Sequence, residues 1–160
     1  MLDPKSEKGS PVDVSPIIKT GEIKSTGHGG RVKPAKILVI DDEPEITDIV
    51  ETFLENAGYE VKSENSSTIG IERAKSYLPD LVLLDIMMPF MDGYEICQEL
   101  KRSEKTKSIP VVFLTGKDAQ SDEGKSFQVG GILFIKKPFS CERLLEIVKV
   151  VLMTADKANK

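Results

Sequence analysis

Residues 81–85, with the sequence LVLLD, are four consecutive apolar residues followed by an aspartate. Three further apolar runs of the same length occur at 37–40 (ILVI), 111–114 (VVFL) and 132–135 (ILFI). A short apolar run without alternation is typical of a strand that is covered on both faces, as in a parallel sheet between two layers of helices. The stretch 81–85 therefore predicts a central strand of an α/β domain.

Helical patterns separate these apolar runs. Apolar residues recur at helical spacing within 46–57, 71–78 and 94–100, and a last helix is expected at 142–153 after a serine that suits an N-cap. Residues 59–63 alternate between apolar and polar, which indicates a more exposed strand. The chain therefore reads as five β/α units, and these favour a doubly wound parallel sheet with helices on both faces.

Composition narrows the class of protein. The chain has 160 residues, is 39% hydrophobic and 30% charged, and has a net charge of −4, so a nucleic-acid-binding surface is not indicated for the molecule as a whole. No apolar run approaches the roughly 20 residues that span a bilayer, and the N-terminus lacks a signal-peptide pattern. The cysteines Cys97 and Cys141 show no metal or redox spacing. We therefore expect a cytoplasmic protein with reduced thiols and no membrane partner.

The N-terminal segment differs from the rest of the chain. Residues 1–36 contain four of the nine prolines, five of the twelve glycines and no aromatic residue, and seven Lys and Arg against four Asp and Glu give them a formal charge of +3. Such a segment cannot bury enough apolar area to offset its ordering entropy. We therefore predict a flexible tail at 1–35, one folded domain at 36–155 and a short C-terminal tail at 156–160.

Charged or hydroxyl residues follow the buried runs. They are Asp41, Asp42 and Glu43 after the first run, Asp85 after the second, Thr115 at the end of the third, and Lys136 and Lys137 after the fourth. Each alone has a plainer explanation, since an aspartate after a strand commonly caps a helix and a surface lysine is commonly solvated. The carboxyl ends of parallel strands, however, meet at one edge of a sheet, where doubly wound proteins bind ligands.

Carboxylates that meet at such an edge repel one another, so they raise each other's pKa or bind a cation. Oxygen ligands in an open site suit Mg²⁺, which accepts phosphate oxygens as further ligands. Carboxylates, a divalent cation, a lysine and a hydroxyl are together the groups that phosphoryl transfer uses, and a carboxylate can itself be the nucleophile. The joint pattern therefore predicts phosphoryl chemistry at this edge.

Four segments carry a family resemblance: 37–44 (ILVIDDEP), 81–93 (LVLLDIMMPFMDG), 111–116 (VVFLTG) and 134–139 (FIKKPF). In this order and spacing they resemble the signature segments of bacterial response-regulator receiver domains, and the resemblance covers residues 36–153. It implies a flavodoxin-like fold with strand order 2-1-3-4-5. It also implies two-component phosphorelay signal transduction by a stand-alone receiver, similar to the single-domain regulators of chemotaxis.

The resemblance also implies a role for each site residue. Asp85 would be the phosphoacceptor. Asp41 and Asp42 would bind Mg²⁺ together with Asp85 and the backbone carbonyl of Met87. Thr115 would donate a hydrogen bond to a phosphoryl oxygen.

The resemblance further implies that Lys137 pairs with the carboxylate and later with the phosphoryl group. Lys136 is the competitor for this role, and its neighbour is favoured because it directly precedes Pro138, to which a cis peptide bond is expected. Phe134 occupies the position of an aromatic side chain that swings inward on activation. The plainer alternative is that Phe134 is simply part of the core.

Phosphorylation adds negative charge, and the resemblance implies that this switches a protein-binding face made of a helix within 118–129, the strand 132–135 and the helix 142–153. Eight of the ten residues from 144 to 153 are apolar, more than a one-faced helix needs. This excess predicts a partner on that face, either a second copy in a homodimer or a downstream protein target. A rival possibility is that residues 16–18 of the tail fold back over it.

The phosphoryl donor should be a histidine kinase or a phosphotransfer protein, because the sole histidine, His28, lies in a glycine-rich segment and is a poor phosphohistidine. The chain ends soon after the last helix, so we expect output by protein contact, with no nucleic acid. The protein would be a phosphoacceptor switch that assists only its own phosphorylation and dephosphorylation.

Two rival classes remain open. One is an aspartate-nucleophile phosphatase, in which a second aspartate stands two residues after the nucleophile; here that position is Met87. The apolar Met87 also leaves little to position an attacking water, so slow self-dephosphorylation is expected. The other rival is an interaction module that works without phosphorylation, which the complete set of acceptor residues disfavours.

Overall fold

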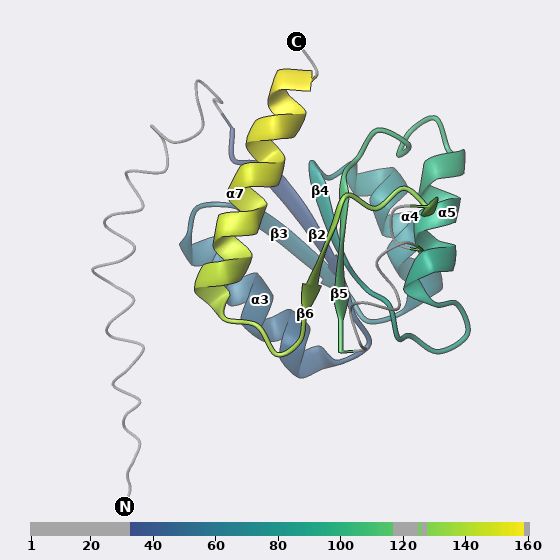
Figure 1. Ribbon diagram of the computed structural model, residues 1–160, viewed down its shortest axis with the longest axis horizontal. Helices are drawn as coiled ribbons and strands as arrows, with labels where there is room; N and C mark the ends of the chain where they lie inside the picture. Colours follow the sequence, from purple (N-terminus) through teal and green to yellow (C-terminus); the bar gives the residue numbers. More distant parts are fainter. Residues whose placement is uncertain (1–32, 117–124, 126–127, 159–160) are drawn as a thin grey trace, which may run out of the picture.

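The structure is a computed structural model that describes residues 33–116, 125 and 128–158. They form one parallel sheet between two pairs of helices (Figure 1). The strands are β2 (Lys36–Ile40), β3 (Glu60–Glu64), β4 (Leu81–Asp85), β5 (Val111–Thr115) and β6 (Leu133–Lys136). The helices are α3 (Pro44–Asn56), α4 (Ser67–Tyr77), α5 (Gly93–Arg102) and α7 (Cys141–Ala158).

The strands lie in the order β3-β2-β4-β5-β6, which is 2-1-3-4-5 in chain order. All neighbouring strands pair in parallel. This confirms the predicted flavodoxin-like, doubly wound sheet. The inner strands β2, β4 and β5 correspond to three of the four wholly apolar runs, and every residue of β4 and β5 is buried. The edge strand β3 is partly exposed, as predicted from its alternating pattern. The run 132–135 was predicted to be buried, but β6 is partly exposed because it has a neighbouring strand on one side only.

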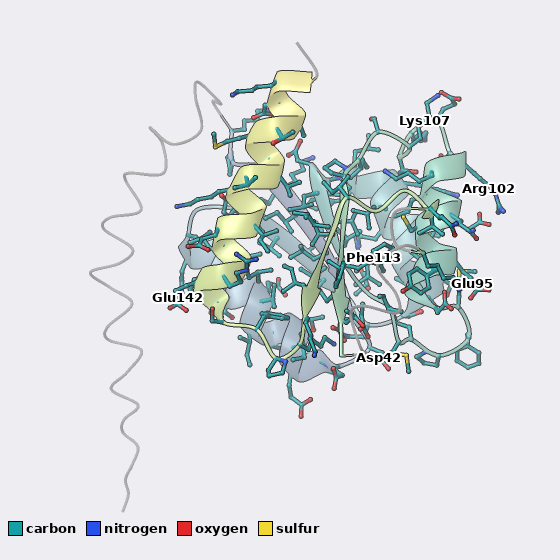
Figure 2. All side chains as sticks on the ribbon, viewed as in Figure 1. Asp42, Glu95, Arg102, Lys107, Phe113 and Glu142 are labelled. Atoms are coloured by element: carbon teal, nitrogen blue, oxygen red, sulfur yellow. The ribbon has the colours of Figure 1, made fainter. Side chains whose placement is uncertain are left out.

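Each face of the sheet packs against its own helices. Leu83 and Val112 point into the layer covered by α3 and α7, whereas Leu84 and Phe113 point into the layer covered by α4 and α5. Figure 2 shows Phe113 in the middle of the sheet, where it is fully buried, with its ring centroid 5.4 Å from that of Tyr94. Two full apolar layers therefore hold the strands in register and fix where their ends lie.

Two boundaries differ from the prediction. Leu78, assigned to the apolar face of the second helix, instead ends α4 as its C-cap with φ 51° and is half exposed. Helix α7 begins as predicted, with Ser140 Oγ accepting a hydrogen bond from the backbone N–H of Arg143 (3.0 Å), but it continues to Ala158. The segment predicted as a C-terminal tail, 156–160, therefore begins inside a helix.

Other predictions fall outside the described residues. They include the flexible tail up to residue 32, with its apolar residues 16–18, and most of the helix expected within 118–129. Among the described helices, none combines the length and the apolar character that crossing a bilayer requires.

Candidate functional site

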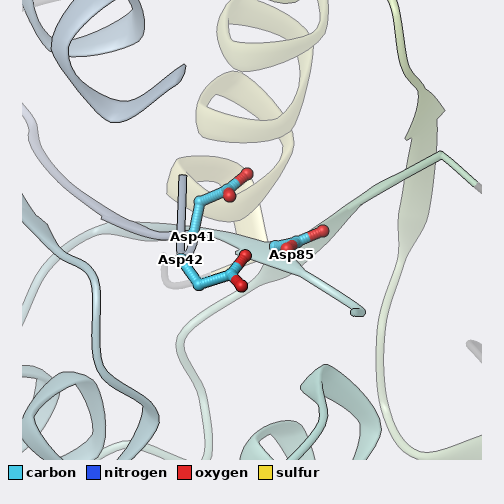
Figure 3. A group of neighbouring side chains, drawn as sticks. All are labelled: Asp41, Asp42 and Asp85. Atoms are coloured by element: carbon cyan, nitrogen blue, oxygen red, sulfur yellow. The ribbon is translucent and has the colours of Figure 1, made fainter. Parts of the chain in front are cut away.

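The carboxyl ends of β2 and β4 bring three aspartates together. Asp85 is the last residue of β4, and Asp41 and Asp42 directly follow β2, its partner strand. One carboxylate oxygen from each of the three side chains lies within 4.8 Å of the others (Figure 3). The predicted meeting of these residues at one edge is therefore what the fold produces.

Asp41 is held by its immediate surroundings. Its side chain is buried, and Oδ1 accepts a hydrogen bond from the backbone N–H of Glu43 (3.0 Å). Its backbone carbonyl accepts one from Asn65 Nδ2 (2.7 Å), and the same amide group donates to Thr47 Oγ1 (3.2 Å). Asn65, just beyond β3, was not predicted. A polar residue directly after an exposed strand gives no distinguishing signal in the sequence.

Asp85 is positioned by a close approach between β4 and α5. A Cβ atom on Gly93 would lie 2.3 Å from the backbone oxygen of Asp85, so only glycine lets α5 begin this near the strand end. The carbonyl of Ile86 accepts hydrogen bonds from the N–H groups of Met88 (3.1 Å) and Gly93 (2.9 Å), which fold the following loop back onto the strand. These contacts fix the position of the Asp85 backbone, and the residue is only 2% exposed.

Lys137 reaches the aspartates from the far edge of the sheet. Its Nζ lies 2.8 Å from Asp41 Oδ2, 3.0 Å from Glu43 Oε1 and 3.4 Å from Asp85 Oδ1. The peptide bond between Lys137 and Pro138 is cis, as predicted. The backbone N–H of Lys137 donates to the carbonyl of Thr115 (2.6 Å), which ties the lysine to the end of β5.

Of the two candidate lysines, Lys137 contacts two of the aspartates. Lys136 belongs to β6 and is exposed, with its Cα paired to that of Thr115. The contact of Glu43 with Lys137 was missed. Glu43 had been noted only as one of the charges after the first strand, and no role was assigned to it. Its only signal was its place next to Asp42 at the same strand end.

Burial and like charge shape the ionisation of the acids. Desolvation, together with the negative charge of Asp41, raises the pKa of Asp85 to about 7. Desolvation also raises the pKa of Asp41, although the nearby Lys137 ammonium and the hydrogen bond from the backbone N–H of Glu43 oppose it. Burial alone would lower the pKa of Lys137, but its contacts with Asp41, Glu43 and Asp85 raise it overall, so the ammonium stays charged.

The cluster fits a small divalent cation. Oδ2 of Asp41 is buried and makes no well-directed hydrogen bond with any described residue, although the Lys137 ammonium lies close to it. Three carboxylates supply only hard oxygen donors, the ligand type that Mg²⁺ selects. Burial is the main cause of the raised pKa of Asp41 and of Asp85, and a cation here would stabilise both carboxylates in their charged form. The carbonyl of Met87, predicted as a further ligand, belongs to the loop that folds back at Ile86.

The remaining predicted residues lie around this cluster. Thr115 is the buried last residue of β5, the strand next to β4. Phe134, on β6, is half-buried and packs against the apolar layer under α4 and α5. Met87 exposes its side chain in the loop after Asp85, and Phe90 in the same loop is fully exposed with φ 70°. Their roles in phosphorylation and switching stay predictions.

Comparison with known proteins agrees with the geometry. Residues 37–149 match the family model described as "Response regulator receiver domain". The chain is 39% identical over 122 residues to the "DNA-binding dual master transcriptional regulator RpaA" of Synechocystis, covering 76% of this chain and 51% of that protein. It is 33% identical over 123 residues to the "Alkaline phosphatase synthesis transcriptional regulatory protein PhoP" of Bacillus subtilis, covering 77% and 50%.

A solved structure shares the fold over nearly its whole length. The Vibrio cholerae chemotaxis protein CheY4 superposes with a TM-score of 0.71 and 29% identity, covering 74% of this chain and 98% of that one. In contrast, the chain spans about half the length of the curated relatives named above. The predicted stand-alone organisation and the predicted absence of a nucleic-acid partner draw no support from relatives named as transcriptional regulators, and stay predictions.

Proposed function

The chain belongs to the response regulator receiver domain family, and from that premise we propose that Asp85 accepts a phosphoryl group from the phosphohistidine of a histidine kinase or phosphotransfer protein. The observation that carries the proposal is the placement of a buried carboxylate 3.4 Å from an ammonium and within 4.8 Å of two further carboxylates. This is the set of groups that phosphoryl transfer to a carboxylate needs.

In the proposed step, an oxygen of Asp85 forms a bond to phosphorus while the bond from phosphorus to the donor imidazole nitrogen breaks. The nitrogen keeps the electron pair and takes up a proton. Asp41 and Asp42, with Asp85 and the carbonyl of Met87, would hold Mg²⁺, which when bound neutralises charge on the phosphoryl oxygens. Lys137 supplies positive charge on the other side, and Thr115 would donate its hydroxyl hydrogen bond to a phosphoryl oxygen.

The test uses a small-molecule donor, phosphoramidate, with Mg²⁺ and intact-mass detection. We expect a single phosphoryl adduct on the wild-type chain, loss of the adduct in Asp85→Asn, and retention of it in Asp48→Asn, which changes an exposed aspartate of α3. An unmodified wild-type chain, or an adduct that persists in Asp85→Asn, would contradict the assignment.

We further propose that the protein is a switch and turns over no external substrate. Met87 stands where an aspartate-nucleophile phosphatase would carry its acid–base aspartate, and its exposed apolar side chain offers no hydrogen bond to orient a water. We expect the phosphorylated form to lose phosphate slowly, and Met87→Asp to hydrolyse it faster. The lifetime of the adduct after removal of phosphoramidate measures this.

The proposed output face lies at the edge of the sheet. Ile132 and Leu133 are 42% and 37% exposed where β6 begins, and Phe134 is the half-buried residue that follows them. Movement of Phe134 toward the acceptor would change the packing of this edge by shape alone, since its ring carries no hydroxyl. We propose that a second copy or a target protein binds here, with α7 contributing the exposed Val150 and Met153. A cytoplasmic location is part of the proposal and agrees with the free thiols of Cys97 and Cys141.

Light scattering with and without beryllofluoride and Mg²⁺ tests the homodimer. We expect the mass to double in the activated state and Ile132→Lys to prevent this, whereas Ile49→Lys, at an exposed site on α3, leaves it unchanged. Deletion of residues 1–32 tests whether the tail covers the face, in which case the dimer would form without activation. A monomeric mass in every state would exclude the homodimer and leave a target protein.

A further inference from the structure

Glu43 makes a contact that its position in the fold does not require. It is the N-cap residue of α3, yet its side chain accepts no hydrogen bond from the first turn of the helix. The carboxylate instead turns toward the site, where Oε1 lies 3.0 Å from the Lys137 ammonium, 94 positions away in the chain. Helix capping, the ordinary use of a polar side chain at this position, is therefore not what holds it there.

Because of this contact, three carboxylates share the Lys137 ammonium. The ammonium lies nearer to Asp41 (2.8 Å) and Glu43 (3.0 Å) than to Asp85 (3.4 Å), which is the weakest of the three partners. A phosphoryl group on Asp85 would bring new oxygens that also need this ammonium, because it is the only described cation that contacts the cluster. Glu43 and the phosphoryl group would therefore compete for one lysine.

We propose that Glu43 is a positioning residue that holds Lys137 back from the phosphoacceptor in the unphosphorylated state, so that it weakens binding of the phosphoryl group. This inference rests on the proposed function, since it concerns the same site. Glu43 itself would touch neither the phosphoryl group nor the reacting oxygen. Its side chain is 56% exposed, so its contact is partly screened by water and its effect should be moderate.

The test measures the affinity for beryllofluoride, a phosphoryl mimic, in the presence of Mg²⁺ by calorimetry. Glu43→Gln removes the charge but keeps the shape, and we expect an affinity about two- to five-fold higher than that of the wild type. Glu45→Gln is the matched control, because it removes one negative charge from the exposed first turn of the same helix. It should leave the affinity within experimental error of the wild type.

A second variant separates contact from charge. Glu43→Asp keeps the negative charge but is one methylene too short to reach Lys137 at the present distance, so we expect it to gain most of the affinity that Glu43→Gln gains. Wild-type affinity in Glu43→Asp, together with a gain in Glu43→Gln, would mean that only the local charge matters and would overturn the proposal. Unchanged or weaker binding in both variants would also overturn it.

A readout without metal or phosphoryl mimic addresses the resting state directly. In the metal-free wild type, the NMR signal of the Lys137 ammonium should be protected from exchange with water by its three carboxylate partners. The protection should fall in Glu43→Gln and stay unchanged in Glu45→Gln. If the wild type binds no beryllofluoride at all, the proposed function fails. If it binds and the Glu43 variants match it in both measurements, only the present inference fails.

Discussion

The middle of the inner strands and their carboxyl ends are buried to the same extent, yet burial acts on them in opposite directions. Leu83 and Phe113, in the middle, have lost all contact with water and stabilise the fold by doing so. Asp41 and Asp85, at the ends, are as deeply buried, and desolvation raises the pKa of each. The same strands thus gain stability at their centre and lose some at the edge that carries the site.

The largest expected effect lies in the middle of the sheet. Leu83→Ala removes a fully buried side chain between β2 and β5 and should lower the free energy of unfolding by about 3–5 kcal/mol, because it leaves a cavity in a packed layer. Urea denaturation followed by circular dichroism measures it. A loss below about 1 kcal/mol would show that this layer is looser than its burial implies.

A smaller loss of stability is expected when the positive charge of Lys137 is removed. Lys137→Met leaves the buried carboxylates without their counter-charge and should destabilise the metal-free protein by about 2–3 kcal/mol at pH 8. The loss should shrink at pH 5, where Asp85, with a pKa of about 7, is protonated. Lys136→Met, at the exposed neighbour, is the control and should change stability little at either pH. Equal losses at both pH values would contradict an electrostatic origin.

Removal of a carboxylate should raise the free energy of unfolding, the opposite of the effect of removing the lysine. Asp85→Asn should stabilise the metal-free protein by about 1–2 kcal/mol at pH 8, because a buried charge beside Asp41 disappears. The pKa of Asp85 is raised from 3.8 to about 7, so between these values the folded state binds more protons than the unfolded state. The contribution of Asp85 to stability is therefore present at low pH and lost as the pH rises through 4 to 7.

The free energy of unfolding, measured by denaturation at each pH, should fall more steeply with rising pH for the wild type than for Asp85→Asn. The two proteins should be nearly equally stable near pH 4. Mg²⁺ should then raise the stability of the wild type more than that of the variant, because binding to the folded state adds stability. A variant that is less stable than the wild type at pH 8 would show that the strand ends carry no electrostatic penalty.

The smallest expected effect on stability concerns the loop that follows Asp85. Phe90 has φ 70°, a left-handed conformation that is unfavourable for a side chain with a Cβ, and its ring is fully exposed. Phe90→Asn should stabilise the protein by about 0.5 kcal/mol, because asparagine tolerates this conformation and no packing is lost. Phe90→Ala keeps the strain and should be neutral in the same thermal melts. A destabilised Phe90→Asn would show that the ring makes contacts in solution.

The fold was accessible to sequence reasoning where burial is complete. The runs 81–84 and 111–114 were predicted to be buried strands, and the cluster of Asp41, Asp42 and Asp85 followed from the rule that parallel strands end at one edge. The predicted bounds of the edge strand β6 were less accurate. The last strand begins at Leu133 and not at residue 132. An edge strand pairs with one neighbouring strand only, so its ends are less strictly fixed.

The features that could not be predicted from the sequence are individual side-chain contacts and one helix end. Nothing in the order of residues tells that Glu43 leaves its helix end for Lys137, or that Asn65 holds the backbone of Asp41. Leu78 fitted the helical spacing, but Pro79 follows it and the chain turns into the left-handed region there. The contacts of Glu43 and Asn65 join segments that are distant in the sequence, whereas the end of α4 at Leu78 is a local effect of the following proline.

The ammonium that contacts Asp41 and Asp85 comes from the end of the described sheet that is last in chain order. Lys137 follows β6, the final strand in chain order and the edge strand of the sheet, whereas the three aspartates precede residue 86. Residues 33–116 therefore include all three aspartates but not the lysine that contacts two of them. Under the proposed function, a chain shortened before β6 would keep the carboxylates and lack the ammonium that is proposed to bind the phosphoryl group.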